Sequence, residues 1–189
     1  MPDFLLQLDR DLFKFINQEL SNAFFDWVLP WMRNPKFWIP LYVFIIAFCV
    51  YRYKKQGVIL VLMLALAAGF ADFTSASLIK KTVQRDRPCR DVVTSQTVIS
   101  RVPCGTGYSF PSTHATDHFA MAVFLCLAFF RKWKWVGIAV IFWAAIICFA
   151  QVYVGVHFPV DITAGAIYGG LVGWLFFVGF KKWQPGFVA

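Results

Sequence analysis

Charged residues are scarce in this chain: they make up 15% of its 189 positions, whereas 59% are hydrophobic and 19% are aromatic. The uncharged stretches are longer than the core of one soluble domain needs, which argues against a soluble globular protein. Internal repeats and low-complexity linkers are also absent, so one domain over residues 1–189 is the simplest organisation. We therefore expect an integral membrane protein that contacts the bilayer and has no nucleic-acid partner.

The long apolar runs predict an all-α fold, a polytopic membrane helical bundle, because a helix needs about 20 residues to cross the hydrocarbon core. About five transmembrane helices are expected within residues 36–183: Phe37–Tyr51, Gly57–Ile79, Ser112–Phe130, Trp135–Val156 and Ile162–Phe180. The first run is short, but its polar flanks can snorkel and so lengthen it. No pattern indicates an oligomeric state.

Residues 1–35 have a different pattern, which predicts helices that lie in the membrane interface. One helical stripe is apolar and consists of Leu5, Leu8, Leu12, Phe15 and Ile16. Polar residues such as Asp9 occupy the rest of that helix. Asn22 is suited to cap a second short helix, Ala23–Met32, in which Trp27 and Trp31 would lie at headgroup level. A basic leader and a cleavage site are both missing, so we do not expect a cleaved signal peptide.

Positive charge outside the candidate sites collects in three patches, which a five-helix arrangement places on one side of the membrane. They are Arg52 with Lys54 and Lys55, Arg131 with Lys132 and Lys134, and Lys181 with Lys182. The positive-inside rule makes this side cytoplasmic. The loop at residues 80–111 and the turn around His157 then lie on the outer face of a bacterial inner membrane. Six Lys and Arg residues on that loop break the rule, which suggests that they hold an anion.

Two of the five cysteines, Cys89 and Cys104, lie in the outer loop, and the other three lie within apolar runs. Fifteen positions separate the two loop residues. In an oxidising compartment a disulfide between them would stabilise the fold by about 3 kcal/mol through loop closure. The alternative is two unpaired thiols.

Three clusters of ionisable residues interrupt the apolar sequence, and ionisable groups in a membrane indicate function by default. Lys80 ends one predicted helix, His114 begins the next, and His157 lies between the last two. Asp161 follows His157 by about one helical turn, so its carboxylate could accept the proton of the imidazole Nδ1. That bond would fix the tautomer and leave Nε2 free to attack.

The Pro111-Ser112-Thr113-His114 sequence starts a helix with Ser112 as a plausible cap, so that backbone N–H groups point outward. Such a helix end binds oxyanions. Lys80 adds a full positive charge, and Arg87 can hold two phosphate oxygens through its planar guanidinium. Together these parts suit phosphoryl transfer, in which one histidine attacks phosphorus and another protonates the departing oxygen.

These residues resemble the three motifs of the type 2 phosphatidic acid phosphatases, or lipid phosphate phosphatases, whose site is shared with vanadium haloperoxidases. The lysine, six residues, Arg-Pro motif matches Lys80 to Arg87-Pro88. The Pro-Ser-Gly-His motif matches Pro111 to His114, with threonine at the glycine position. The third motif, Ser-Arg, five residues, His, three residues, Asp, matches Ala150 to Asp161, with Ala-Gln in place of Ser-Arg.

The resemblance implies that His157 is the nucleophile, Asp161 orients it, and His114 is the general acid. Phosphate ligands would be Lys80, Arg87, Ser112, Thr113 and Gln151. Gln151 occupies the place of a third cation, and a neutral amide cannot neutralise charge. Transition-state stabilisation should therefore fall by roughly 3 kcal/mol unless another cation, Arg85, Arg90 or Arg101, reaches the site.

The implied substrate is a phosphorylated lipid: undecaprenyl diphosphate, lipid A or phosphatidylglycerol phosphate, among which the sequence does not discriminate. No cofactor and no metal is implied. His114 and His118 share the spacing of a zinc-binding helix, but Ala115 stands where that motif has its glutamate base. Three alternatives remain open: a lipid phosphotransferase, a catalytically silent lipid-binding or scaffold protein, and histidines and arginines that only contact headgroups.

Overall fold

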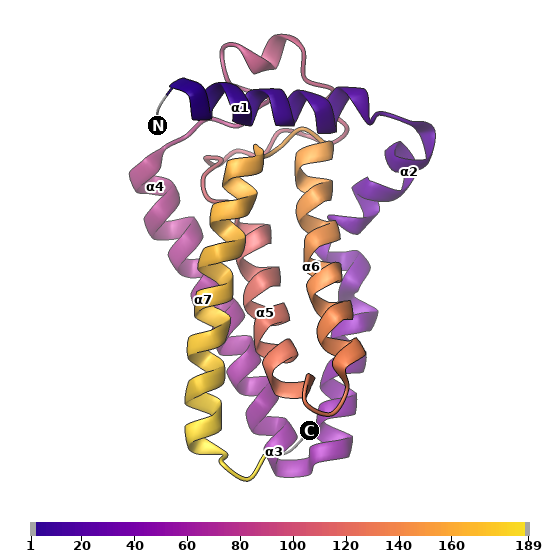
Figure 1. Cartoon of the computed structure of the whole chain (residues 1–189), viewed down its shortest axis with the longest axis vertical. Coiled ribbons are helices and arrows are strands. Elements are labelled where there is room, and N and C mark those ends of the chain that lie inside the picture. Colours follow the sequence, from indigo (N-terminus) through magenta and orange to yellow (C-terminus); the bar gives the residue numbers. More distant parts are fainter. Residues whose placement is uncertain (1–2, 188–189) are drawn as a thin grey trace.

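Helices form the whole architecture of the computed structural model, which describes residues 3–187. In chain order they are α1 (Asp3–Lys14), η1 (Phe15–Glu19), α2 (Ala23–Met32), η2 (Pro35–Trp38), α3 (Ile39–Phe73), η3 (Thr74–Ile79), α4 (Lys80–Val83), η4 (Thr94–Gln96), α5 (Thr113–Phe129), α6 (Lys134–Tyr153) and α7 (Pro159–Trp183). The long helices run side by side along the molecule, and α1 crosses one end of the bundle (Figure 1). The predicted all-α membrane bundle is confirmed.

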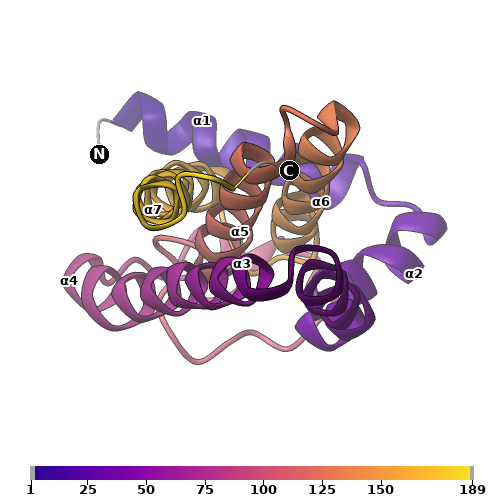
Figure 2. The same cartoon turned by 90° about the horizontal axis from the view of Figure 1, so that it is seen from below.

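The longest helical segment folds back on itself. From Pro35 to Val83 it has 49 residues, which as one straight helix would extend about 73 Å, more than twice the thickness of the hydrocarbon core. The chain reverses at Lys54, whose backbone has φ 53° and ψ −127°. Gly57 then packs so closely on the Cys49 carbonyl that a Cβ would overlap it. Figures 1 and 2 show the two arms, which correspond to the first two predicted membrane helices.

Close packing of α7 against α5 fixes the position of the site. Three glycines spaced four apart on α7, Gly165, Gly169 and Gly173, face the α5 backbone. A Cβ on Gly169 would overlap the Thr116 carbonyl, and one on Gly173 would overlap that of Ala120. Small residues at this spacing let two membrane helices approach closely. The first turns of α5 and α7, which carry two of the three clusters, are therefore held side by side.

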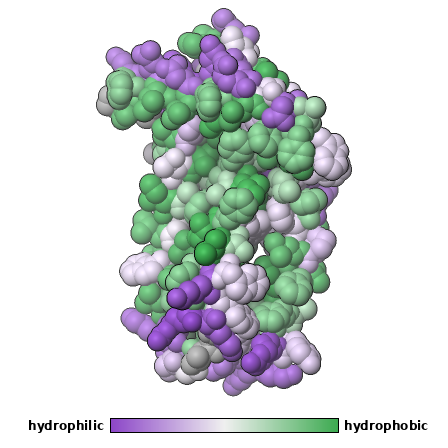
Figure 3. Space-filling view, turned by 45° about the vertical axis from the view of Figure 1, so that its right-hand side comes forward, coloured by the Kyte–Doolittle hydropathy of each residue, from purple (hydrophilic) through white to green (hydrophobic). Residues whose placement is uncertain are grey.

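The surface has a broad hydrophobic belt between two hydrophilic ends (Figure 3). The segment Pro35–Val83, α6 and α7 are long and apolar enough to cross a membrane, whereas α5 is a shorter apolar helix of 17 residues. The three basic patches all lie at the end opposite α1: at the turn of α3, at the α5–α6 connection and at the end of α7 (Figure 1). The structure thus separates these patches from the three site clusters, as predicted.

The N-terminal helices form within the predicted limits, and Asn22 caps α2 by accepting from the N–H of Phe25 at 2.9 Å. The α1 stripe containing Leu5, Leu8 and Leu12 is exposed, and its placement in the membrane interface stays a prediction. On the other side of this segment, Phe13 and Asn17 are buried. Asp9 is buried as well, which the expected polar face of an interfacial helix does not explain; its partners are described below.

Candidate active site

The three clusters meet at the end of the bundle crossed by α1. Lys80, at the start of α4, is 8% exposed, and its Nζ donates to the Tyr108 carbonyl at 2.9 Å. His157 lies in the α6–α7 connection and is 2% exposed. His114 lies in the first turn of α5, whose cap residue Ser112 donates its N–H to the Asp161 carbonyl at 3.0 Å. The structure therefore brings residues of all three motifs together at this end of the bundle.

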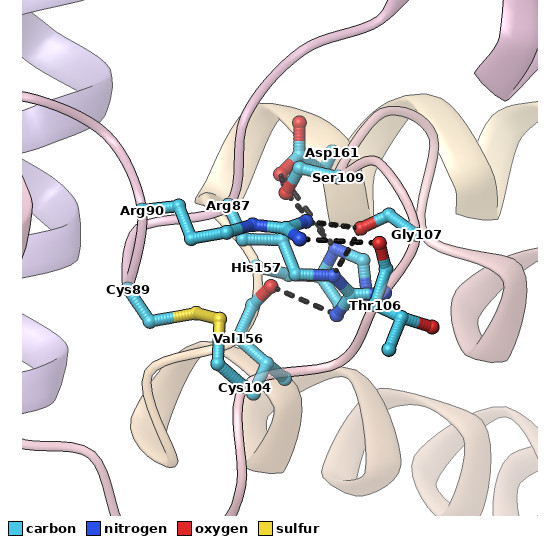
Figure 4. Close-up of a disulfide and its surroundings, with 10 residues drawn as sticks. All are labelled: Arg87, Cys89, Arg90, Cys104, Thr106, Gly107, Ser109, Val156, His157 and Asp161. Carbon is cyan, nitrogen blue, oxygen red and sulfur yellow. Dashed lines mark hydrogen bonds and ion pairs between the residues drawn. A yellow bond between two sulfur atoms is a disulfide. The ribbon is translucent and has the colours of Figure 1, made fainter.

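Arg87 is the cation nearest to His157. Its Nη1 lies 3.5 Å from His157 Nε2 and donates to the Val156 carbonyl at 3.2 Å, while its Nε donates to the Gly107 carbonyl at 2.8 Å (Figure 4). Gly105 leaves room for this guanidinium, since a Cβ there would lie 3.1 Å from Arg87 Cζ. Arginine only donates, so the contact with Nε2 requires that nitrogen to be unprotonated. A phosphate between them would meet both a cation and an imidazole nitrogen with a lone pair.

The loop over Arg87 is tied together covalently. Cys89 and Cys104 form a disulfide whose Cα atoms are 6.1 Å apart. Arg90 reinforces it by donating to the carbonyl of Thr106 at 3.1 Å and to that of Gly107 at 2.5 Å (Figure 4). Both terminal nitrogens of Arg90 are thus bonded to the loop backbone. It is not the additional phosphate ligand that the sequence left open.

Asp161 does not bond directly to His157, which corrects the sequence-based expectation. The His157 Nδ1 to Asp161 Oδ2 distance is 3.7 Å, too long for a hydrogen bond. The Ser109 hydroxyl lies between them, 3.3 Å from Nδ1 and 2.5 Å from Oδ2 (Figure 4). A carboxylate only accepts, so the hydroxyl donates to Asp161 and accepts from the Nδ1 proton. The relay leaves Nε2 with a free lone pair, as the expected direct bond would have done.

Other partners of Asp161 explain why it stays at this distance. Its Oδ1 accepts from Arg85 Nη1 at 2.8 Å, and its Oδ2 accepts from the Phe158 N–H at 2.8 Å. Arg85 also bonds to Asp9 of α1 at 2.5 Å, and its guanidinium lies 4.2 Å from the Phe158 ring centre. Arg85 is therefore engaged by two carboxylates and is not available as a phosphate ligand.

Burial keeps His157 neutral. It lowers the pKa of His157 to about 4; Asp161 opposes this shift, whereas the positive charges of Arg87 and Lys80 reinforce it. A neutral imidazole near pH 7 has the lone pair that a nucleophile needs. The same burial lowers the pKa of Arg87, an effect to which the charges of Arg90 and Arg33 add.

The ring nitrogens of His114 make no hydrogen bond to the described residues 3–187. Its ring is stacked on His118, with 6.3 Å between centres and 8° between planes. His118 Nδ1 bonds to the His114 carbonyl at 2.7 Å, and its Nε2 lies 3.2 Å from the Tyr42 hydroxyl. His118 thus supports the histidine beside it. Across the described part of the chain, no three His, Cys, Asp or Glu residues are grouped to hold a metal ion.

The start of α5 is built as the sequence suggests. The Ser112 hydroxyl accepts from the Ala115 N–H at 3.4 Å, and the Ser112 N–H donates to the Asp161 carbonyl at 3.0 Å. Ser112 is fully buried, and its side chain caps the helix instead of being exposed at the site. Thr113, half-buried, begins the helix. Of these two residues, Thr113 is the better placed to contact phosphate.

Gln151 is fully buried on α6, and its amide oxygen accepts from Arg33 Nε at 3.2 Å. Its amide nitrogen has no hydrogen-bond partner within residues 3–187. Arg101 does not reach it, because its guanidinium bonds to Asp26, to Ser21 and to the Tyr153 carbonyl. None of the three arginines proposed from the sequence compensates for Gln151. The cation beside it is Arg33, which the motif pattern did not reveal.

An apolar groove of about 630 Å³ lies between the first arm of α3, α5 and α6. Its lining is almost wholly hydrophobic and includes Trp38, Phe48, Phe129, Trp135, Trp143 and Ile146. Trp143 also packs edge-on against His118, with 5.0 Å between ring centres. The groove therefore reaches His118, the residue stacked beside His114, and continues along the apolar part of the bundle.

Comparisons with known proteins show the family to which the chain is related. The family model of the PAP2 superfamily matches residues 56–185. The chain is 33% identical to a lipid A 4'-phosphatase of Bacteroides thetaiotaomicron, over 94% of this chain and 79% of that protein. It is also 33% identical to an undecaprenyl-diphosphatase of Sulfolobus acidocaldarius, over 73% of this chain and 61% of that protein.

Solved structures show the same fold. The crystal structure of a transmembrane PAP2 type phosphatidylglycerolphosphate phosphatase from Bacillus subtilis superposes with a TM-score of 0.73 at 22% identity, over 98% of this chain and 90% of that one. Aquifex aeolicus LpxE superposes with a TM-score of 0.65 at 23% identity, over 89% and 94%. The chain belongs to the PAP2 superfamily, which confirms the family that its three motifs indicated.

Proposed function

We propose that this protein is a membrane lipid phosphatase that hydrolyses a lipid phosphate or diphosphate through a phosphohistidine intermediate on His157. One observation carries the proposal: His157 Nε2 lies 3.5 Å from Arg87 Nη1, while Nδ1 is held by the Ser109 and Asp161 relay. The imidazole is therefore neutral, oriented and adjacent to a cation. These are the features that a histidine needs in order to attack phosphorus.

The reaction has two steps. Arg87 and Lys80 hold the phosphate oxygens, Nε2 of His157 attacks the terminal phosphorus, and the bond from that phosphorus to the oxygen of the leaving group breaks. The leaving group is the lipid alcohol of a monophosphate or the lipid monophosphate of a diphosphate. His114 gives its proton to that departing oxygen. Water then attacks the phosphohistidine and loses a proton to His114, the phosphorus–nitrogen bond breaks, and inorganic phosphate leaves. Every proton and ligand in this scheme comes from the chain or from water, so independence from metal ions is part of the proposal.

The groove beside the site supports a lipid substrate. A phosphorylated headgroup bound between Arg87 and Lys80 would place its hydrocarbon chain next to Trp143, where the groove begins. The substrate class named for the relatives covers lipid A, undecaprenyl diphosphate and phosphatidylglycerolphosphate. We propose one of these three for this chain, with lipid access from the side of the bundle.

The proposed location is a bacterial inner membrane with the active site facing the periplasm or exterior. The three basic patches at the opposite end of the bundle support this orientation through the positive-inside rule. The disulfide near the site supports it as well, since disulfides persist in oxidising compartments.

The test is phosphate release by purified protein from each of the three lipids, with and without a chelator. We expect release from at least one lipid, unchanged by the chelator, and no release by His157→Ala. An acid-labile phosphoprotein should be trapped in the wild type and be absent from His157→Ala. Release that survives this substitution would overturn the mechanism.

Two other functions would give different results in the same assay. A phosphotransferase would release little phosphate from one pure lipid and would transfer the group to a second added lipid. A silent binding protein would release none from any lipid while still binding one. Gln151 stands where the family motif has a cation, and this neutral residue is the observation that favours the silent binding protein. Arg33, which contacts Gln151, is the cation that could replace the missing charge.

A further inference from the structure

The unexplained feature of the site is a buried amide with an unused donor. Gln151 is completely buried, its oxygen accepts from Arg33, and its nitrogen bonds to nothing within residues 3–187. An unsatisfied buried polar group costs about 1–3 kcal/mol. Buried polar groups in native structures nearly always have a hydrogen-bond partner. A bound ligand that accepts from the Gln151 amide would supply this partner.

Arg33 has no carboxylate partner among residues 3–187. Four other arginines behave differently: Arg10 pairs with Asp91, Arg85 with Asp9 and Asp161, Arg101 with Asp26, and Arg90 with loop carbonyls. Throughout the described residues, the only side-chain hydrogen bond of Arg33 goes from Nε to Gln151, which leaves its terminal NH₂ groups unused. Burial also lowers the pKa of Arg33 without any compensating carboxylate.

Backbone hydrogen bonds fix the position of Arg33 at the end of α2. It ends α2 with its N–H bonded to the Leu29 carbonyl, and Asn34 then caps the turn that begins at Pro35. Its partner Gln151 is linked to Arg87 through Val156: the Val156 N–H donates to the Gln151 carbonyl at 3.2 Å, and the Val156 carbonyl accepts from Arg87 at 3.2 Å. Arg33 therefore reaches the segment next to Arg87 and His157 through Gln151, although it is 118 positions from Gln151 in the sequence.

We propose that Arg33 supplies the cation that position 151 lacks and binds the substrate phosphate together with Arg87 and Lys80. Gln151 orients the guanidinium through its oxygen and donates its free N–H to the same phosphate. The inference rests on the proposed phosphatase function. It makes Gln151 a working part of the site, because an arginine there would compete with Arg33 for the same space and the same charge.

The first test is charge removal. We expect Arg33→Gln to lower kcat/KM for phosphate release by about 100- to 1,000-fold, the usual effect of losing one donor to a transition-state oxyanion. Arg33→Lys should fall in between, because it keeps the charge and loses the planar pair of donors. Lys36→Gln is the matched control: it removes an exposed cation three residues away and should change kcat/KM by less than about threefold, a range set by surface electrostatics.

The second test is a charge exchange. If the two positions share one function, Arg33→Gln combined with Gln151→Arg should recover most of the activity that Arg33→Gln loses. A role for Arg33 in folding alone predicts no such recovery. Inorganic phosphate provides a readout of binding, since its inhibition constant should rise at least about tenfold in Arg33→Gln and return in the double variant.

These outcomes separate the inference from the function on which it rests. Wild-type release that is abolished by His157→Ala but unchanged by Arg33→Gln would overturn the role of Arg33 and leave the phosphatase intact. A folded Arg33→Gln protein that is inactive and not recovered by the exchange would also count against it. No release by the wild type from any lipid would overturn the function itself.

Discussion

Removal of the Ser109 hydroxyl is the most direct test of how His157 is activated. In the structure this hydroxyl is the only described link between His157 Nδ1 and the Asp161 carboxylate, at 3.3 Å and 2.5 Å. Ser109→Ala would leave the buried Nδ1 proton without an acceptor. It would also remove the preference for the tautomer in which Nε2 carries the lone pair.

The magnitude follows from the charge of the acceptor. A hydrogen bond that ends on an ionised group contributes about 1.5–3 kcal/mol, and 1.36 kcal/mol corresponds to a factor of about ten in rate. We therefore expect kcat to fall by roughly 10- to 150-fold. The lower end applies if the His157 ring moves toward Asp161, since their 3.7 Å separation is only slightly longer than a direct bond. KM should change little, because the Ser109 hydroxyl bonds to His157 and Asp161 and not to the proposed phosphate ligands.

Phosphate release measured at saturating lipid is the assay, with thermal unfolding to show that the variant is folded. Thr163→Ala is the matched control, since it removes an exposed α7 hydroxyl that bonds only to the Pro159 carbonyl. In an Asp161→Asn background, Ser109→Ala should add less than about threefold, because the relay no longer ends on an anion. Full kcat in folded Ser109→Ala, or additive effects of the two substitutions, would refute the relay.

Three further predictions concern the pH, the disulfide and the groove. The pKa of His157 is lowered to about 4 from an ordinary 6.5, so kcat/KM should keep its value as pH falls to about 5 and decline only below that. Folding stability should decrease between pH 6.5 and 4, because in this range the unfolded state takes up a proton that folded His157 does not. A decline of kcat/KM with a midpoint at pH 6.5 would contradict this. Replacing Cys89 and Cys104 by serine should lower the free energy of unfolding by about 3 kcal/mol in denaturant titrations, and no change would show that the loop is held without the bond. Trp143→Ala should raise KM for long-chain lipids and leave it unchanged for a short-chain phosphate, whereas equal effects on both would place the hydrocarbon chain elsewhere.

The parts that sequence predicts well here are those set by local patterns. Long apolar runs determine where membrane helices form, and the Asn22 cap fixes the start of α2 within the predicted limits. The order of the membrane helices also brings His114 and His157 to one end. Two consecutive membrane helices separate them, so the chain crosses the bilayer twice and returns to the same side. Each of these conclusions depends only on neighbours in the sequence and on the thickness of the bilayer.

The parts that sequence did not predict depend on contacts between distant residues. Ser109 lies three residues before Ser112, and nothing in its neighbourhood marks it as a link between His157 and Asp161. Arg33 precedes the first membrane helix by a few residues. The sequence indicates only that this residue lies on the same side of the membrane as the three motifs, not that it contacts Gln151. Tertiary packing, which no local pattern encodes, decides both positions.

Asp9 shows most clearly why a motif is an incomplete description of this site. Burial raises the pKa of Asp9, although Arg85 and the N–H of Val160 oppose the shift. A buried ion pair of this kind often contributes little net stability. Its effect is geometric: through Arg85 it connects α1 to Asp161 and occupies Oδ1, so Oδ2 alone is left to face His157, and Ser109 is needed to span the remaining distance. The orientation of His157, the proposed nucleophile, thus depends on a helix that lies wholly outside the three motifs.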